Sequence, residues 1–180
     1  TACDSFLDED PKSSLTLDTY YKTSADIIGN VNYLYRDGAP DKMGNMTGAY
    51  RGSSLSVMNM VTGYFVNEYE GQEVDCSYAR QLTRQDFTQS CCNYLTNDTW
   101  KSCYKSINVA NAVIKYVDGV EMDNQAQYKA EARFFRALNY FYLVKMFGDV
   151  PMVTEPTEDA TLVEYPTRTA ASEVFNTVII

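Results

Sequence analysis

Two segments with helical periodicity, joined by a short connection, constrain the fold of this 180-residue chain more than any other feature. The first starts at Asn97 or Asp98, either of which can cap a helix, and ends at a break at Gly119. The second covers residues 123–147 and is followed by Gly148, a residue type typical of the position after a helix. Because the connection is short, the two helices must turn back on each other, and we expect an antiparallel helical hairpin.

Apolar residues in both segments recur at the spacing of an α-helix. In the first helix they form one stripe, which consists of Trp100, Cys103, Ile107, Ala110, Ile114 and Val117. In the second helix one face consists of Ala130, Phe134, Ala137, Phe141 and Val144, and another consists of Tyr128, Ala132, Phe135, Leu138, Tyr142 and Met146. A helix with two apolar faces needs two neighbours, so we expect the second helix to be sandwiched.

The chain before the hairpin also carries helical patterns. One begins at Leu17 and closes at residues 38–40, and its apolar positions are Ile27, Val31 and Leu34. Within it, Thr23 and Asp26 have the spacing of an N-terminal capping arrangement. A second helix is expected over residues 53–65, where the helically spaced residues are Leu55, Met58, Val61 and Phe65.

Residues 67–96 show no sustained period, although they contain aromatic residues and cysteines. This stretch is either a functional loop or contains elements that the periodicity does not reveal, and the sequence leaves both alternatives open. Residues 150–166 are predicted to be extended, and a further helix is predicted from Thr169, with Val174 and Val178 on one face. We expect residues 1–16 to form an extended tether.

The composition argues against several functions. The chain has no histidine, which is the usual general base near pH 7 and the commonest metal ligand. A net charge of −9 repels phosphate backbones, so we do not expect nucleic-acid binding. There are 15 tyrosines and 8 phenylalanines against one tryptophan, and tyrosine suits surfaces that are both apolar and hydrogen-bonding. Phosphate-binding loops, nucleophile elbows and calcium loops are absent from the sequence, and we expect no cofactor.

The cysteines allow three interpretations. Four of them cluster in the sequence, namely Cys76, Cys91, Cys92 and Cys103. They lack the Cys-x-x-Cys spacing of a zinc site. Disulfides that pin residues 67–96 to the helix of Trp100 are the favoured interpretation, and thiols in a reducing compartment are the alternative.

The segment Thr1-Ala2-Cys3 resembles the processed start of a bacterial lipoprotein. A diacylated Cys3 would hold the protein firmly on a membrane, because two acyl chains exceed the marginal hold of one. The acidic run at residues 8–10 would keep the tether solvated.

Charged and amide residues on the hairpin have structural and functional interpretations. Recognition of an anionic ligand by Arg133 and Arg136 is one possibility. The favoured one is an interhelical ion pair that involves these arginines or Glu131, because buried arginines are rarely left without partners. Asn108 and Asn111 are expected to bond neighbouring backbone rather than a ligand.

The segment Glu131–Pro151, EARFFRALNYFYLVKMFGDVP, is similar to the signature helix and following turn of the SusD/RagB family of outer-membrane nutrient-binding lipoproteins. Further matches are Cys3 with Phe6-Leu7-Asp8, the segment Trp100–Ile107 leading to Ala110-Asn111, and Tyr165-Pro166 with Arg168. The resemblance implies an all-α fold in which tetratricopeptide-like helix pairs form a scaffold with long irregular loops. It also implies that residues 17–180 are the N-terminal part of a longer helical domain.

The function that this resemblance implies is capture of oligosaccharides at the cell surface, without catalysis. The protein would be held in the outer membrane by Cys3 and would pass its ligand to a SusC-like TonB-dependent transporter. Capture of peptides and a scaffold that binds only other proteins are the alternatives. A hydrolase would need paired carboxylates across a cleft.

Family ligand sites draw on long variable loops, which here indicates residues 67–96. Aromatic rings stack on sugar rings, and polar side chains bond the sugar hydroxyls. The candidate ligand-binding residues are therefore Tyr69, Asp75, Tyr78 and Arg80. The alternative is that these tyrosines pack against neighbouring loops. Residues 67–96 contain no tryptophan, which departs from the starch-binding pattern of the family. Four residues of the hairpin are expected to be structural, namely Trp100, Glu131, Arg133 and Arg136.

Overall fold

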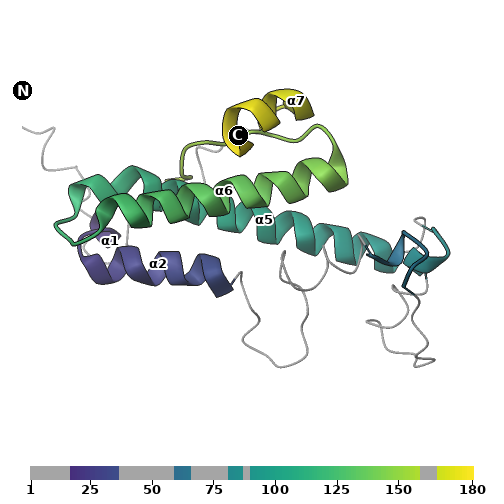
Figure 1. The fold of residues 1–180 in the computed structure, drawn as a ribbon, viewed down its shortest axis with the longest axis horizontal. Coiled ribbons are helices and arrows are strands. Elements are labelled where there is room, and N and C mark those ends of the chain that lie inside the picture. The colour runs from purple at the N-terminus through teal and green to yellow at the C-terminus, as the bar shows by residue number, and fades with distance from the viewer. Residues whose placement is uncertain (1–16, 37–58, 66–80, 87–89, 159–165) are drawn as a thin grey trace, which may run out of the picture.

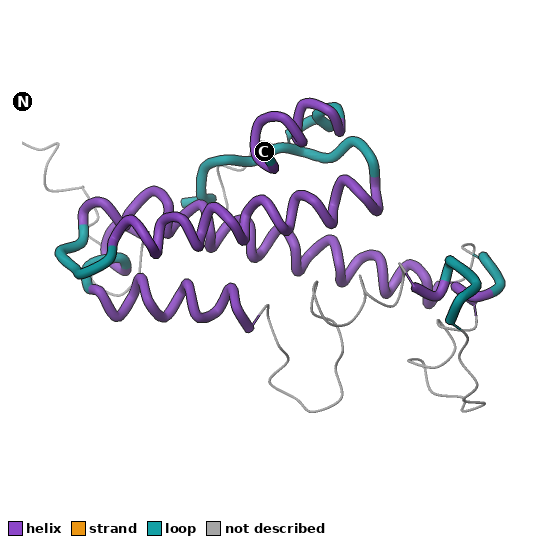
Figure 2. Tube along the Cα trace, viewed as in Figure 1, coloured by secondary structure: helices purple, strands orange, loops and turns teal. Residues whose placement is uncertain are grey.

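All regular elements in the described part of the chain are helical, so the predicted all-α fold class is confirmed (Figures 1 and 2). The computed structural model describes residues 17–36, 59–65, 81–86, 90–158 and 166–180. Its centre is the predicted antiparallel hairpin, made of α5 (Ser90–Tyr116) and α6 (Gln125–Phe147). A short 3-10 helix, η1 (Val117–Gly119), leads from α5 into the turn. The described helices lack the combination of length and apolar character that a membrane span requires.

Shorter helices pack on two sides of this hairpin (Figure 1). The single turn α1 (Leu17–Tyr20) precedes α2 (Ser24–Arg36), which contacts both α5 and α6. On the other side lie α7 (Ala171–Val174) and the π-helical turn η3 (Phe175–Ile179). Two buried clusters result, one between the hairpin and α2 and one between the hairpin and α7 with η3.

The predicted start of the first hairpin helix was wrong, because α5 begins at Ser90 rather than at Asn97 or Asp98. These two residue types favour caps, but they also occur inside helices when tertiary contacts hold the backbone. Thr99, one residue later, is fully buried, so α5 is already packed against the rest of the molecule at that residue. The last part of residues 67–96 is therefore helical, and residues 81–83 form a further helical turn.

The predicted capping arrangement at the start of α2 is confirmed. The carboxylate of Asp26 accepts a 2.8 Å hydrogen bond from the backbone N–H of Thr23 and a 2.7 Å bond from its hydroxyl. In return, the backbone N–H of Asp26 donates to the Thr23 hydroxyl over 3.4 Å. This reciprocal cap starts a new helix, which explains why the pattern that begins at Leu17 is interrupted before Ser24. The predicted core positions of α2 are all buried: Ile27, Val31 and Leu34.

The expectation that α6 lies between neighbours is confirmed, because α5 and α2 contact it and so do α7 and η3, but one of its two predicted apolar faces is not the one they cover. The buried side of α6 consists of Ala132, Phe135, Asn139, Tyr140 and Leu143. In the other predicted face, Phe134 is 61% exposed and Phe141 is 40% exposed. The physical reason is that α2 and α7 contact the hairpin on the two flanks of α6, which leaves its outer face uncovered by either helix.

The turn after α6 positions the last helix. Gly148 has a φ of 68° and a ψ of −123°, a conformation that favours glycine. The next residue, Asp149, accepts a 2.9 Å hydrogen bond at its carboxylate from the backbone N–H of Ala171, which opens α7. Val150 and Thr169 then form an antiparallel bridge. The helix predicted from Thr169 is confirmed with a start two residues later, and Val174 is buried as expected.

The helix predicted over residues 53–65 is only partly inside the described residues. Residues 59 and 60 are helical, but residues 61–64 form a turn in which Gly63 has a φ of 78°. Phe65 is 54% exposed instead of continuing an apolar helical face. The helical spacing of Phe65 was therefore a coincidence of sequence, because the backbone has already turned at Gly63.

Candidate functional site

The predicted extended segment after α6 is clamped onto the hairpin, and we call its residues 150–158 the strap (Figure 2). The hydroxyl of Tyr104 donates a 2.7 Å hydrogen bond to the carbonyl of Pro151. The hydroxyl of Tyr140 accepts a 2.6 Å bond from the N–H of Val153 and donates a 2.9 Å bond to its carbonyl. These two tyrosines of the hairpin therefore anchor the strap through its backbone atoms, so the bonds do not depend on the side chains of Pro151 and Val153.

Two asparagines of α5 extend the clamp further along the strap. The side-chain amide of Asn111 donates to the carbonyls of Val153 and Glu155 over 3.0 and 3.2 Å. The side-chain oxygen of Asn108 accepts a 2.7 Å bond from the N–H of Thr157. Both asparagines thus bond backbone, as expected, but it is the backbone of the strap, 42 to 49 residues away, rather than that of neighbouring residues. The backbone groups that Tyr104, Tyr140 and the two asparagines bond belong to alternate residues, which are Pro151, Val153, Glu155 and Thr157, as the two-residue period of extended backbone favours.

Burial keeps the clamping tyrosines protonated. Removal of the phenol from water raises the pKa of both Tyr104 and Tyr140 above the usual value of 10.0. Their hydroxyls therefore remain able to donate to backbone carbonyls even at a pH at which an exposed tyrosine loses its proton. At the end of the strap, Lys115 and the hydroxyl of Tyr116 both contact the carboxylate of Glu158.

Arg136 supports this clamp through neutral partners. Its Nη1 atom lies 3.1 Å from the side-chain oxygen of Asn111 and 3.5 Å from the carbonyl of Thr154. Burial lowers the pKa of the guanidinium from its usual value. The ion pairs found among the described residues are Lys115–Glu158 and Lys129–Asp118, so the expected interhelical ion pair of the arginines is not among them.

The other residues expected to be structural occupy different places on the hairpin. The ring of Trp100 lies 5.0 Å from that of Tyr104 and 5.1 Å from that of Phe147, measured between centroids. Glu131 links α6 to α2, because its carboxylate accepts a 3.2 Å bond from the Tyr35 hydroxyl. Arg133 is exposed on α6.

The four candidate ligand-binding residues, Tyr69, Asp75, Tyr78 and Arg80, lie outside the described residues. The segments on either side of them are described, and we call residues 59–65 and 81–86 the aromatic end. These segments contact each other: the side chain of Gln85 donates to the carbonyl of Val61 over 3.4 Å, and the Thr83 hydroxyl lies 3.9 Å from the sulfur of Met60. Both segments lie near the start of α5 (Figure 1).

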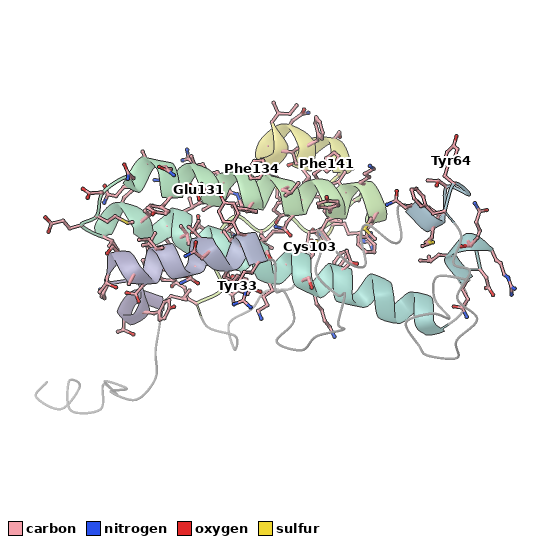
Figure 3. All side chains as sticks on the ribbon, turned by 60° about the horizontal axis from the view of Figure 1, so that its bottom comes forward. Tyr33, Tyr64, Cys103, Glu131, Phe134 and Phe141 are labelled. Atoms are coloured by element: carbon pink, nitrogen blue, oxygen red, sulfur yellow. The ribbon has the colours of Figure 1, made fainter. Side chains whose placement is uncertain are left out.

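Two exposed aromatic residues at the aromatic end were missed as ligand candidates. Tyr64 is 89% exposed and projects from the molecule, and Phe65 is 54% exposed (Figure 3). A signal was present in the sequence, because Gly63 directly before them is a residue type that ends helices. An exposed ring offers a flat apolar face, and the Tyr64 hydroxyl adds hydrogen-bonding capacity. The aromatic end is therefore the candidate binding surface of the described residues.

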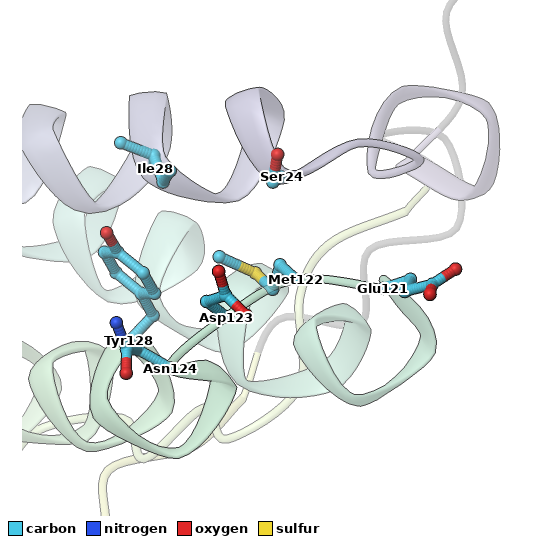
Figure 4. Close-up of a pocket in the computed structure, with 7 residues that line it drawn as sticks. All are labelled: Ser24, Ile28, Glu121, Met122, Asp123, Asn124 and Tyr128. Carbon is cyan, nitrogen blue, oxygen red and sulfur yellow. The ribbon is translucent and has the colours of Figure 1, made fainter.

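A hollow lies at the end of the hairpin opposite the aromatic end (Figure 4). Its volume is about 580 Å³, and its lining residues are Ser24, Ile28, Glu121, Met122, Asp123, Asn124 and Tyr128. The lining has two carboxylates and no Lys or Arg, so the hollow disfavours anions. Among the described residues, no three potential metal ligands come together.

The cysteine interpretations are tested at one position only. Cys103 is a fully buried thiol in the cluster between the hairpin and α7. A disulfide at this position is therefore not formed in the structure. Cys76 and the side chains of Cys91 and Cys92 lie outside the described residues, so a disulfide among them stays a prediction.

Fold and surface together define a helical scaffold that presents exposed aromatic side chains at one end. Comparison with known proteins then gives the family. The family model for SusD-like proteins described as "Starch-binding associating with outer membrane" matches residues 5–179. The chain belongs to this SusD-like family, so the resemblance found in the sequence is confirmed.

Individual relatives agree with this assignment. SusD-like protein P25 of Formosa agariphila is 27% identical over 164 residues, which cover 86% of this chain and 29% of the relative. SusD-like protein P2 of the same organism is 25% identical over 175 residues, which cover 96% of this chain and 32% of the relative. The crystal structure of a SusD superfamily protein from Parabacteroides distasonis shares the fold, with a TM-score of 0.62 at 22% identity, over 85% of this chain and 31% of that one. The chain thus spans about a third of the length of the relatives that it matches.

Proposed function

We propose that this chain is part of a cell-surface protein that binds oligosaccharides and delivers them to a SusC-like TonB-dependent transporter in the outer membrane. The observation that carries the proposal is the family match over residues 5–179. The family's description names starch binding and an association with the outer membrane, and it names no reaction, which supports binding rather than catalysis.

The proposed glycan site combines the aromatic end with the adjoining residues Tyr69, Asp75, Tyr78 and Arg80. The exposed rings of Tyr64 and Phe65 directly precede this stretch and support the location. Sugar rings have apolar faces edged with hydroxyl groups, so exposed aromatic rings with nearby polar side chains match them chemically. The contact between Gln85 and Val61 joins the two described segments that flank this stretch.

The proposal is tested by measuring binding of the full-length protein to a panel of polysaccharides, mucin glycans and oligopeptides. We expect a polysaccharide or glycan to bind, and we expect Tyr64→Ala and Tyr78→Ala each to weaken that binding at least about fivefold, since stacking on one aromatic ring is worth on the order of 1–3 kcal/mol. Tyr64→Phe keeps the ring and should retain most of the affinity. Asn32→Ala, at an exposed position of α2, serves as the control.

Other results would redirect the proposal. Binding of peptides alone would favour peptide capture, and a full panel without binding would favour a scaffold for other proteins. Normal glycan binding by Tyr64→Ala and Tyr78→Ala together would move the site away from the aromatic end.

We further propose that Cys3 carries the lipid that holds the protein on the outer membrane. The support is the segment Thr1-Ala2-Cys3 and the family's association with that membrane. Full-length protein should fractionate with outer membranes, and Cys3→Ala should release it. Cys103→Ala, which changes a buried thiol elsewhere, is the matched control. Membrane fractionation that survives Cys3→Ala would disprove the anchor.

A further inference from the structure

The hollow at the turn of the hairpin has the size of a ligand pocket. Its volume of about 580 Å³ lies within the range of roughly 300–1,000 Å³ that is usual for small-molecule sites. Ser24 and Ile28 of α2 line one side of it, and Asp123 and Tyr128 face them from the turn and from the start of α6 (Figure 4). Residues from two helices and the turn between η1 and α6 therefore surround one space.

Several polar groups around the hollow are not used by the fold. Among the described residues, the carboxylates of Glu121 and Asp123 take part in no hydrogen bond and no ion pair. Asn124 stands directly before α6, where asparagine usually caps a helix, but its side chain forms no capping bond. These groups are therefore available to a partner that enters the hollow.

The remaining walls of the hollow are apolar. They consist of the side chains of Ile28, Met122 and Tyr128. Met122 and Tyr128 also pack against the buried cluster between the hairpin and α2, which holds these two walls in place. An aromatic ring attracts a cation to its face, and a thioether adapts to the shape of an apolar chain.

The charge of the lining selects the sign of the ligand. The two carboxylates face no basic residue of the lining. Lys129, which follows Tyr128 in α6, forms an ion pair with Asp118, so its charge is already compensated. An inorganic cation matches the hollow poorly, because no three potential metal ligands come together in the described part of the chain.

We propose that the hollow binds an organic cation, namely an ammonium or guanidinium group at the end of an apolar chain. The chain lies along Ile28, Met122 and Tyr128, and the positive group lies by the carboxylate of Asp123. Lysine and arginine side chains have this construction, because an apolar stem carries their charged head. A free alkyl amine has the same chemistry, so the experiment distinguishes the two sources.

The test titrates the full-length protein with small probes and follows the methyl NMR signal of Met122. Nα-acetyl-lysine methylamide represents a lysine side chain in a peptide, cadaverine represents a free amine, and Nα-acetyl-norleucine methylamide has the same chain without the charge. We expect the lysine derivative to shift the Met122 signal in a saturable manner, and the norleucine derivative to bind at least about fivefold more weakly.

A pair of charge-removing variants tests the contact with Asp123. Asp123→Asn should weaken binding of the lysine derivative at least about threefold, because it removes the charge of the carboxylate. Glu173→Gln removes one negative charge from an exposed position of α7 and is the matched control. It should leave the affinity within about 1.5-fold of the wild type, because salt screens distant exposed charges.

Each result decides the proposal. Saturable binding of the lysine derivative alone supports it with a polypeptide as the source, and binding of cadaverine as well supports it with free amines included. Failure of every cationic probe to shift the Met122 signal would overturn it, as would equal binding of the norleucine derivative. Equal effects of Asp123→Asn and Glu173→Gln would reduce the binding to net charge and would also overturn it. If Asp123→Asn fails to fold, Glu121→Gln takes its place in the same comparison.

Discussion

The strap region and the aromatic end use the same residue type in opposite ways. In the strap region, Tyr140 is fully buried and its hydroxyl makes two hydrogen bonds to Val153. At the aromatic end, Tyr64 is 89% exposed. The tyrosine excess of the chain therefore does not indicate one function. Part of it fastens an extended segment to the helices, and part of it remains exposed at the candidate binding surface.

The family-like segment Glu131–Pro151 could serve either the scaffold or the ligand site, and its contacts distinguish the two. Its residues Arg136 and Tyr140 bond the strap or its clamp, and Gly148 and Asp149 set the turn into α7. These contacts all serve the scaffold. The most recognisable sequence of the chain thus reports its fold, whereas the ligand is expected to be chosen elsewhere.

The largest expected effect comes from Tyr140→Ala in the strap region. This change removes a buried ring and both hydrogen bonds to Val153, and it should lower the free energy of unfolding by about 3–5 kcal/mol, as for large-to-small changes in cores. Tyr140→Phe keeps the ring and should cost about 1–2 kcal/mol. Urea denaturation measures both variants. A loss below about 1 kcal/mol for Tyr140→Ala would show that the strap is not held at this point.

A smaller effect is expected from Asn111→Ala. The variant loses two bonds to strap carbonyls and leaves Arg136 without its side-chain acceptor, which should cost about 2 kcal/mol. Asn32→Ala, at an exposed position of α2, is the matched control and should stay within about 0.5 kcal/mol of the wild type. Equal effects of the two substitutions in the same denaturation experiment would contradict the clamp.

Gly148→Ala should destabilise the protein by about 1 kcal/mol, because its φ of 68° is unfavourable for a residue with a Cβ atom. A Cβ atom at this position would meet no other part of the molecule within 4 Å, so the cost is conformational rather than steric. Gly119 also has open space around it but no positive φ, and Gly119→Ala should change stability by less than about 0.5 kcal/mol. Thermal unfolding of the two variants compares them directly, and a larger loss for Gly119→Ala would refute the explanation.

The smallest stability effect is expected at the aromatic end. Tyr64→Ala should change the free energy of unfolding by less than about 0.5 kcal/mol, because little of this side chain is buried. The same variant is expected to weaken glycan binding. Tyr64→Ala should therefore affect binding more than stability, whereas Tyr140→Ala should affect stability more than binding. A loss of stability at Tyr64 similar to that at Tyr140 would mean that both tyrosines are structural.

Local sequence information was sufficient for the helices and their main ends. The period of the apolar residues indicated the hairpin, the Thr23 and Asp26 spacing indicated the cap of α2, and Gly148 marked the end of α6. These features depend on residues within one or two turns of each other. The early start of α5 was missed because residues 90–97 show no clear period of apolar residues. They are helical as the first part of the long helix that continues to Tyr116.

The candidate site was predictable only in outline. The sequence indicated a stretch rich in aromatic residues between two helices, but it gave no reason to separate Tyr64 and Phe65 from a helical face. The turn at Gly63 and the contact between Gln85 and Val61 decide that separation.

The sequence by itself determined that this chain is helical, acidic and a member of the SusD-like family, because periodicity, charge and motif are all local properties of the chain. Only the tertiary structure decided which tyrosines fasten the strap and which face of α6 stays exposed. Tyr104 meets Pro151, and Asn108 meets Thr157, across separations of 47 and 49 residues. Contacts over such distances follow from how the helices pack, and no local pattern encodes them.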